Sequence, residues 1–419
     1  MMRTQGSFAV LFTLLPLSLL GTAACGQQEP AATPLAPPPA ATLAPEPTPI
    51  EAKKEEPKPV PLTAEQRVKA YQAGWAAFNA KDFAKFQSIW AENATSEMLD
   101  MGPPLVGPVA ITETGAKGFA AGFPDATGDV QLTLVNGNQV LGVVLMRGTN
   151  TGTYVTPMGP VPATNKKVGF LAAHSIELND AGKAVKEVMA YDGGTVAGQL
   201  GLLPMPHRKV IETGWTEKPV VVATGSDTEK ANLAAFAKQV EGFNKHDAAA
   251  ALGAAADGLV FSEQNEPADR TGKKEGLKGF EQMLKAFPDA KLEVKSSWAA
   301  GDYVVATGLW TGTNTGDMPG MKMKKTGKTV SVHVIEIDKF VSGKVTNVWL
   351  FSNGAAAAAQ LGLLPAKPAE PKAKDNKPAV AASKPAVTAA KTEPAAKPAP
   401  ATPAAKPAPA PKAAPTPAN

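Results

Sequence analysis

Two histidines in corresponding strand-like segments are the first candidates for proton transfer. His174 lies in VGFLAAHSIEL and His333 lies in VSVHVIEID, and in each segment the next two residues on the same strand face are apolar. We therefore expect both imidazoles to point toward an interior. A buried imidazole can act as a general acid or base near neutral pH, or it can be a structural hydrogen-bonding group, and both roles stay open.

Asp192 and Asn353 form a second corresponding pair, each directly before a small-residue segment that ends in QLG. Both residue types are favoured at helix N-caps, so one structural role explains both positions. An Asp carboxylate can also take up a proton, whereas an Asn amide cannot. We therefore interpret Asn353 as a cap, and Asp192 as either a cap or an ionisable group with a chemical role.

Other polar and sulfur-containing residues give weaker signals. Tyr191, Glu97 and Glu263 could line a pocket wall. The segment Met318–Lys325, MPGMKMKK, has three thioethers, which could bind Cu(I) or, as we favour, form an adaptable apolar loop over a pocket mouth. The sequence has no zinc-ligand spacing, phosphate-binding loop or nucleophile elbow. We therefore predict no metal site.

These residues belong to a unit that occurs twice. Three short motifs recur in the same order: FPDA at 123–126 and 287–290, GTNTG at 148–152 and 312–316, and QLGLLP at 199–204 and 360–365. Recurrence at a nearly constant separation indicates a tandem duplication of a domain of about 140 residues. The residue types at the candidate positions can therefore be compared between the two copies.

Each copy begins with a helix and ends with strands. Apolar residues at helical spacing open both copies, and Thr63 and Thr228 are the predicted N-caps. Alternating segments follow, and Asn136-Gly137 predicts a hairpin between two of them. Helices first and antiparallel strands afterwards predict an α+β domain in which a curved sheet wraps over helices and encloses a pocket.

The N-terminal segment reads as an export signal followed by a lipid-anchor site. One cation, Arg3, precedes an apolar run, and the segment ends in TAAC with Cys25 as the sole cysteine of the chain. TAAC resembles the lipobox of bacterial lipoproteins, although Thr22 replaces the usual Leu. We predict a signal peptide over 1–25 and lipid attachment at Cys25, with an incidental cysteine after an ordinary signal as the alternative.

Low-complexity segments flank the two copies. Residues 26–62 are rich in Pro, Ala, Thr and Glu, and residues 366–419 are rich in Lys, Pro and Ala. Neither segment has enough large apolar residues to form a core, so we predict disorder in both. The C-terminal segment contains nine Lys and three acidic residues, while the whole chain is only +4. Its charge therefore does not indicate a folded nucleic-acid surface, and we expect no nucleic-acid partner.

The ordered motifs resemble those of a known family. In each copy the order GF, FPDA, GT.TG, His, GK and QLG is similar to the SnoaL-like polyketide cyclases, also called ester cyclases, of the nuclear transport factor 2-like superfamily. The resemblance implies two tandem cone-shaped α+β domains, which we place at 63–205 and 228–365 with a linker at 206–227. Single family domains usually pair through their sheets, so we predict that the two copies pair within the chain.

The resemblance also implies a reaction and its residues. Family enzymes close a polyketide ester by an aldol reaction without a cofactor, using a His and an Asp that fall on His174 and Asp192 here. The same positions fall on His333 and Asn353 in the second copy, and with Tyr191 these residues are expected to line pockets. We predict an envelope lipoprotein that binds an apolar carbonyl compound and acts on it in the first copy. The alternative is a ligand-binding or scaffold lipoprotein that has no catalytic activity.

Overall fold

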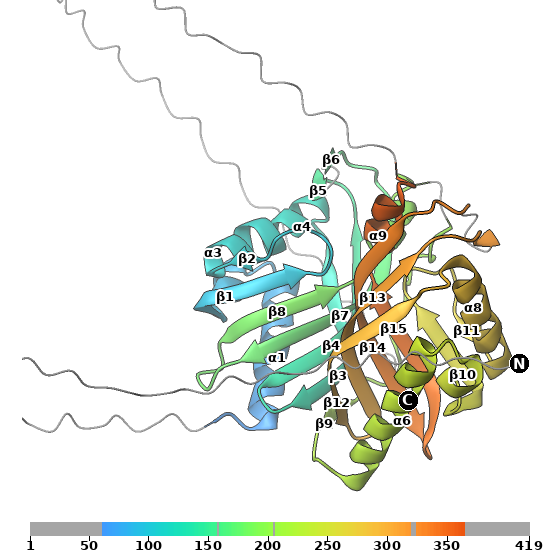
Figure 1. The fold of residues 1–419 in the computed structure, drawn as a ribbon. Coiled ribbons are helices and arrows are strands. Elements are labelled where there is room, and N and C mark those ends of the chain that lie inside the picture. The colour runs from blue at the N-terminus through green and yellow to red at the C-terminus, as the bar shows by residue number, and fades with distance from the viewer. Residues whose placement is uncertain (1–60, 157–158, 204–205, 320–323, 365–419) are drawn as a thin grey trace, which may run out of the picture. The chain divides into compact units, whose positions relative to one another are not determined.

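The two copies fold into the same order of elements in a computed structural model (Figure 1). The structure describes residues 61–156, 159–203, 206–319 and 324–364. Cys25, the predicted signal peptide and both low-complexity segments, apart from residues 61 and 62, lie outside the described residues. The α+β class and the two sheet-plus-helix domains that the sequence predicts are confirmed.

The first copy contains one seven-stranded sheet with helices before and after its central strands. Its elements are α1 (Ala64–Asn79), α2 (Phe83–Ser88), β1 (Trp90–Met98), β2 (Leu105–Val106), α3 (Pro108–Ala110), the π-helix η1 (Ile111–Ala116), α4 (Lys117–Gly122), β3 (Thr127–Asn136), β4 (Gln139–Thr149), β5 (Tyr154–Thr156), β6 (Gly159–Val161), β7 (Lys167–Leu178), β8 (Ala184–Ala190) and α5 (Gly193–Gln199). The sheet order is β2-β1-β8-β7-β4-β3-β9, and β5 and β6 form a separate hairpin.

The second copy repeats this order with one longer helix, α8, in place of α3, η1 and α4, and its described residues include no hairpin between the two central strands. Its elements are α6 (Asp227–Asn244), α7 (Ala248–Ala251), β10 (Ala255–Glu263), β11 (Arg270–Thr271), α8 (Lys273–Ala286), β12 (Lys291–Ala300), β13 (Tyr303–Thr313), β14 (Thr329–Val341), β15 (Lys344–Ser352) and α9 (Gly354–Leu361). The sheet order is β11-β10-β15-β14-β13-β12. The linker contributes β9 (Val220–Val222), which pairs in parallel with β3 of the first copy.

Capping boxes fix where the opening helices begin. Thr63 and Gln66 exchange side-chain and backbone hydrogen bonds at the start of α1, as the sequence predicts. In the second copy the same exchange joins Ser226 and Glu229. The predicted cap at Thr228 is therefore wrong, because α6 begins two residues before the position that corresponds to the start of α1.

The recurring motifs hold the ends of the strands together. Asp125 of FPDA accepts hydrogen bonds from the backbone nitrogen and hydroxyl of Thr149, the last residue of β4. Asp289 and Thr313 repeat this pair in the second copy. Because the same contacts form twice, FPDA and GTNTG are structural motifs.

The glutamine of QLG anchors the last helix to a central strand. Gln199 donates to and accepts from the backbone of Gly169 in β7, at 3.0 Å in both directions. Gln360 makes the same two bonds to Ser331 in β14, at 2.8 and 2.9 Å. These contacts make Gly169 and Ser331 equivalent, a separation of 162 residues.

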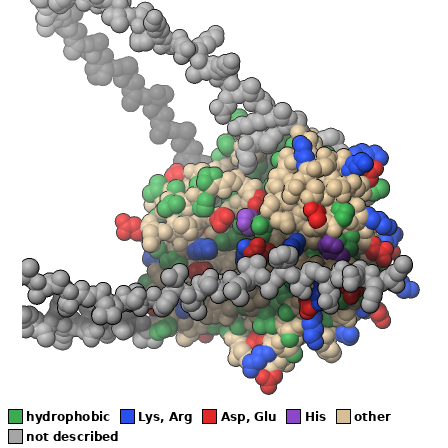
Figure 2. Space-filling view, in the orientation of Figure 1, with side chains coloured by type: hydrophobic (Ala, Val, Ile, Leu, Met, Phe, Trp, Pro, Cys, Tyr) green, Lys and Arg blue, Asp and Glu red, His purple; other side chains and the backbone are tan. Residues whose placement is uncertain are grey.

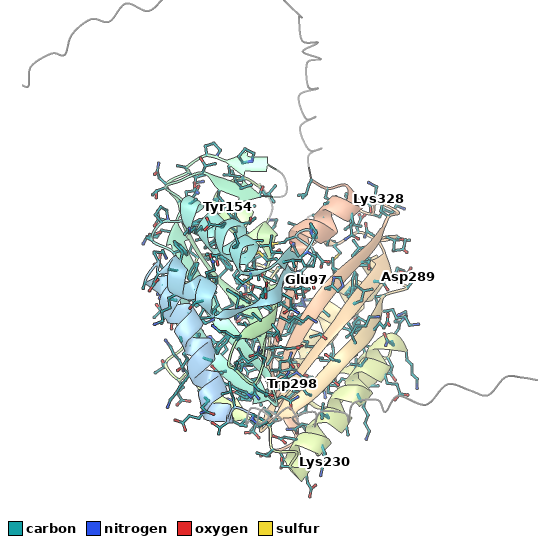
Figure 3. All side chains as sticks on the ribbon, turned by 90° about the vertical axis from the view of Figure 1, so that its left-hand side faces the viewer. Glu97, Tyr154, Lys230, Asp289, Trp298 and Lys328 are labelled. Atoms are coloured by element: carbon teal, nitrogen blue, oxygen red, sulfur yellow. The ribbon has the colours of Figure 1, made fainter. Side chains whose placement is uncertain are left out.

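The two sheets share an apolar core. Each copy has its own core beneath its helices. A further cluster joins residues of β3, β4 and β7 to residues of β12, β13, β14 and β15, including Leu134, Leu145, Val305 and Ile335. Trp298 of β12 belongs to this cluster and is labelled in Figure 3. This arrangement is consistent with the predicted pairing of the two copies within the chain.

Candidate functional site

A large, mostly apolar cavity lies in the second copy. Its volume is about 410 Å³, and its walls come from the sheet and from helices α6, α7, α8 and α9. Six aromatic side chains line it: Phe236, Phe243, Phe261, Phe280, Phe287 and Trp310. The corresponding cavity of the first copy has a volume of about 80 Å³. Pockets for small molecules usually measure roughly 300–1,000 Å³, so the cavity of the second copy has the size of a ligand site.

Exchanges at four wall positions contribute to the difference in volume. Trp90, Phe86, Trp75 and Ile111 of the first copy correspond to Ala255, Ala251, Val240 and Gly276 of the second. The correspondence follows from the elements, because β1 and β10, like α2 and α7, begin at equivalent residues. Each exchange replaces a large side chain with a smaller one, and together they leave space between the helices and the sheet.

A pair of carboxyl groups lies on the sheet wall of this cavity. Glu336 of β14 lines the cavity, and Asp338 follows on the same face of the strand and is fully buried. Burial, the largest cause, and the nearby Glu263 carboxylate together raise the pKa of Glu336 to about 7, although the contact with Asp338 opposes the change. Burial and the neighbouring Glu336 hold the pKa of Asp338 well above its usual range. Both groups therefore retain protons far more readily than exposed carboxyls do.

Helix α6 supplies a partner to this pair. The Gln239 Nε2 donates to Asp338 Oδ2 at 3.1 Å. Two buried acceptors, Gln239 Oε1 and Asp338 Oδ1, have no hydrogen-bond partner among the described residues. Gln239 also lines the cavity, so its Oε1 is a hydrogen-bond acceptor without a partner on the polar side of the cavity.

An ion-paired cluster forms another part of the wall. Arg270 contacts Glu263 Oε2 at 3.0 Å and makes two bonds to the carboxylate of Glu266. The guanidinium lies over the Phe261 ring, 5.2 Å from its centroid. Burial and the Glu263 carboxylate raise the pKa of Glu266 to about 7, although Arg270 opposes this. One arginine thus neutralises part of the charge of two carboxylates at the cavity.

The first copy has a different polar network at its small cavity. The His174 Nε2 lies 2.6 Å from Glu187 Oε1, and its Nδ1 lies 3.0 Å from the Tyr71 hydroxyl. Ser96 donates to the other oxygen of Glu187. Burial by itself would raise the pKa of Glu187, but the bonds from His174 and Ser96 hold it below its usual value. The network uses both ring nitrogens and both carboxylate oxygens internally.

The structure does not bring Asp192 and His174 together. Asp192 is the N-cap of α5, where it accepts hydrogen bonds from the backbone nitrogens of Gly194 and Thr195 at 3.0 and 2.6 Å. It also accepts one from Gly354, the first residue of α9, at 2.9 Å. Burial raises the pKa of Asp192, and these backbone bonds oppose the shift. Asp192 therefore joins the ends of two helices from different copies.

The prediction that His333 points into a pocket is wrong. Its side chain is 48% exposed and lies 2.8 Å from Asp100 of the first copy, outside the cavity lining. Since Gly169 corresponds to Ser331, His333 corresponds to Leu171, and Glu336 occupies the position of His174. The loop before β14 is two residues shorter than the loop before β7, but the equivalent pairs Thr149–Lys167 and Thr313–Thr329 keep the same strand register. His333 lies three residues before Glu336, so its side chain lies on the opposite face of β14.

The remaining predicted residues have mixed locations. Tyr191 lines the small cavity, 3.5 Å from the Tyr154 hydroxyl. Asn353 is a cap for α9, accepting from Ala356 at 3.3 Å, and does not line the large cavity. Glu263 lines the large cavity, whereas Glu97 lines neither. Met318 also lines the large cavity, and the rest of its methionine segment lies largely outside the described residues.

Metal ligands and membrane-spanning helices were also sought in the described part of the chain. Within residues 61–364, excluding the short gaps, no group of three or more His, Cys, Asp or Glu side chains is placed to hold a metal. None of the helices described there is long and apolar enough to cross a membrane. Figure 2 shows acidic and basic side chains interspersed on the face in view.

Glu187, Glu336 and Asp338 were not identified from the sequence. Aligning the two copies through Gln199 and Gln360 in the sequence, a separation of 161 residues, would have paired His174 with Ile335. The separation of 162 that pairs His174 with Glu336 is visible only in the contacts of the two glutamines with Gly169 and Ser331. Glu187 lies on β8 next to β7, on the face that carries His174. In the sequence, Glu187 is only an acidic residue in a strand whose polar and apolar residues do not alternate clearly. That pattern also fits a residue exposed to solvent.

The family model for SnoaL-like polyketide cyclases matches residues 65–200 and again residues 234–361. The two matches together span more than half of the sequence. This chain belongs to the SnoaL-like polyketide cyclase family. The family suggests a cyclase or ligand-binding role, and it appears here as a tandem duplication.

Solved structures similar to this SnoaL-like chain each cover about one copy. AclR from Streptomyces galilaeus is 31% identical over 33% of this chain and 88% of its own, with a TM-score of 0.29. A SnoaL-like protein from Jannaschia sp. CCS1 is 17% identical over 33% and 97%, with a TM-score of 0.31. IdmH from Streptomyces antibioticus is 21% identical over 31% and 98%, with a TM-score of 0.28. A search of curated proteins gave no match.

Proposed function

We propose that this SnoaL-like chain binds an apolar small molecule with a carbonyl group in the cavity of its second copy. We further propose that Glu336 removes and returns a proton on the carbon next to that carbonyl. The observation that carries this proposal is the position of Glu336, with the buried carboxyl group of Asp338 beside it, on the wall of a cavity of about 410 Å³. The family membership supports a small-molecule ligand.

The carboxyl pair has the properties that such a proton transfer requires. A base works best when its pKa lies near the working pH, and burial raises the pKa of Glu336 to about 7. In the reaction the Glu336 carboxylate takes the proton from carbon, and the electron pair of the C–H bond forms an enolate. The enolate then either recovers the proton from Glu336 at another carbon, which is an isomerisation, or attacks a second carbonyl of the same molecule. The attack forms a C–C bond that closes a ring, and the resulting alkoxide takes the proton back from Glu336.

Ser352 could stabilise the enolate oxygen. Its hydroxyl is buried at the cavity wall and accepts a hydrogen bond from Asn265 Nδ2 at 3.1 Å. This leaves the hydroxyl proton available to an oxyanion. Ser352 on β15 pairs with Val334 on β14, two residues before Glu336 and on the same face of the sheet. The Ser352 hydroxyl and the Glu336 carboxyl group therefore both face the large cavity. Donors placed where negative charge develops are a major source of rate enhancement.

The experiment measures hydrogen exchange at carbon. Cyclic and aryl ketones of increasing size are incubated with the protein in D₂O, and deuterium next to the carbonyl is followed by mass spectrometry. We expect protein-dependent exchange that falls at least roughly a hundredfold in Glu336→Gln, the lower end of what a positioned base contributes. The Glu275→Gln variant, at an exposed residue of α8 outside the cavity lining, should retain the exchange. Equal rates in the wild type and Glu336→Gln would refute the catalytic part of the proposal.

A structural role is the second candidate function for the first copy. Its polar groups are satisfied internally by Tyr71, Ser96 and Glu187, and its cavity of about 80 Å³ is small for a ligand. The first copy also caps α9 of the second through Asp192. We therefore propose that the first copy acts mainly as the partner that supports the second.

We also propose that the protein is exported and anchored to a bacterial membrane through a lipid on Cys25. The sole cysteine after an apolar leader supports this proposal. Labelling cells with a radioactive fatty acid tests it: the wild type should carry label, and Cys25→Ser should carry none. Equal labelling of the two proteins would exclude this anchor.

A further inference from the structure

The cavity of the second copy combines an aromatic wall with an excess of acidic groups. Six aromatic rings face the cavity. The acidic groups that line the cavity are Glu263, Glu266 and Glu336, with Asp192 from the first copy, and the fully buried Asp338 lies beside Glu336. Arg270 lines the cavity as a cation, and the charge of Arg208 also acts on Glu266. Aromatic faces attract cations, and carboxylates in an apolar surrounding attract them more strongly than exposed carboxylates do.

The unpartnered polar atoms also point to a particular ligand group. Gln239 Oε1 and Asp338 Oδ1 are both acceptors, both buried and both without a partner among the described residues. Asp338 is fully buried on the strand face that lines the cavity. A buried acceptor without a partner is costly, and a ligand that donates N–H groups would satisfy it. A neutral hydrocarbon or an anion would leave these atoms unpaired.

We propose that the ligand of this cavity is an apolar ammonium compound, whose N–H group lies at Glu336 and Gln239, in front of the buried Asp338, and whose apolar body lies against the aromatic wall. This inference rests on the proposed binding function and adds the charge of the ligand. The ammonium would supply the donors that the two free acceptors lack. It would also balance the acidic groups that Arg270 leaves unpaired.

Binding of a cation has a consequence for the protons of the pair. An ammonium next to Glu336 favours its carboxylate, so binding at neutral pH releases a proton from the pair. The charged and titratable groups that surround Glu336 are Asp338 on β14, Glu263 on β10, Glu266 and Arg270 at β11, Asp192 at α5, and Arg208, whose charge acts on Glu266. Proton release also produces the carboxylate that the proposed proton abstraction needs.

Three probes with one carbon skeleton test the charge of the ligand. Isothermal titration calorimetry at pH 7 compares 4-phenylbutylammonium, 4-phenylbutanol and 4-phenylbutanoate on the full chain, in two buffers of different ionisation enthalpy. We expect the ammonium to bind at least roughly tenfold more tightly than the alcohol, the butanoate to bind weakest, and proton release to accompany the ammonium alone. Alcohol binding as tight as ammonium binding would overturn the inference while leaving the binding function intact.

Two variants test whether Glu336 is responsible for the preference for the ammonium and for the proton release. Glu336→Gln should lower the affinity for the ammonium roughly tenfold and leave the affinity for the alcohol within about twofold, and it should abolish most of the proton release. Glu275→Gln is the matched control, since Glu275 is an exposed residue of α8 outside the cavity lining. An equal loss for ammonium and alcohol would overturn the inference. Absence of binding by all three probes would overturn both the inference and the binding function.

Discussion

Glu336 and His174 occupy equivalent places in the two copies, yet their surroundings give them different properties. His174 has hydrogen-bond partners at both ring nitrogens, and its cavity is nearly filled. Glu336 faces a large cavity with another carboxyl group beside it. Since charge is expensive in an apolar environment, the same position holds a satisfied network in one copy and a group ready to exchange protons in the other.

The raised pKa of Glu336 predicts a pH-dependent stability. Its pKa is about 7 in the folded protein against 4.5 for the free side chain, so the folded state binds more protons between these values. Stability should therefore fall as the pH rises through this window, and the loss should be complete above about pH 7. In Glu336→Gln the loss should shrink by roughly 2 kcal/mol, measured by urea unfolding at pH 5 and pH 8.

The control for this measurement is Glu275→Gln, whose curve should follow that of the wild type. Glu266 is also protonated readily, so a smaller pH dependence in the same direction should remain in Glu336→Gln. If the free energy of unfolding depended on pH in the same way in the wild type and in Glu336→Gln, the raised pKa of Glu336 would be contradicted.

At the scale of elements, the cavity results from small side chains at a few positions of helices α6, α7 and α8 and of strand β10. The helices and strands superpose in order, and the recurring hydrogen bonds of Gln199 and Gln360 keep the sheet and last helix in register. The volume is set by side-chain size at positions such as Ala255, where the first copy has Trp90. The scaffold and the pocket are therefore controlled by different residues.

Transferring one wall residue from the first copy should close the cavity. Ala255→Trp places the side chain of Trp90 at its equivalent position, where the space of about 410 Å³ can receive it. We expect loss of ligand binding by calorimetry, with a free energy of unfolding that is unchanged or raised by about 1–2 kcal/mol from added apolar burial. Retained binding with full affinity would show that the ligand lies elsewhere.

At the scale of the whole molecule, the two copies depend on each other. Their sheets share an apolar core, and Asp192 caps helices from both copies. His333, which was expected in a pocket, instead contacts Asp100 across the two copies. Asp192 and His333, which the sequence predicted to line pockets, thus both contact the other copy.

This dependence predicts that damage to the shared core affects both copies. Ile335 is fully buried in the shared core, so Ile335→Ala should cost about 2–5 kcal/mol. Hydrogen exchange followed by mass spectrometry should then show lost protection in α1 and in α6. The comparison variant Leu259→Ala, in the separate core of the second copy, should affect α6 more than α1. Unchanged exchange in α1 for Ile335→Ala would argue against coupling.

The sequence by itself determined the duplication, the α+β class, the hairpin at Asn136-Gly137 and the capping role of Asn353. These features depend on local patterns, namely repeated motifs, alternation and cap preferences, and such patterns are visible in one dimension. The candidate residues His174 and Tyr191 were also found, because polar groups inside apolar segments are conspicuous.

Only the tertiary structure decided which copy has room for a ligand and which acid lies beside each candidate. Cavity volume depends on four positions spread over three helices and a strand, which meet only after folding. The contacts of Gln199 and Gln360 with the strands make Glu336 equivalent to His174, whereas the pattern in the sequence pairs His174 with His333. His333 and Glu336 are three residues apart on β14, so His333 lies at the contact between the copies and Glu336 faces the cavity, because neighbouring side chains of a strand point to opposite faces of the sheet.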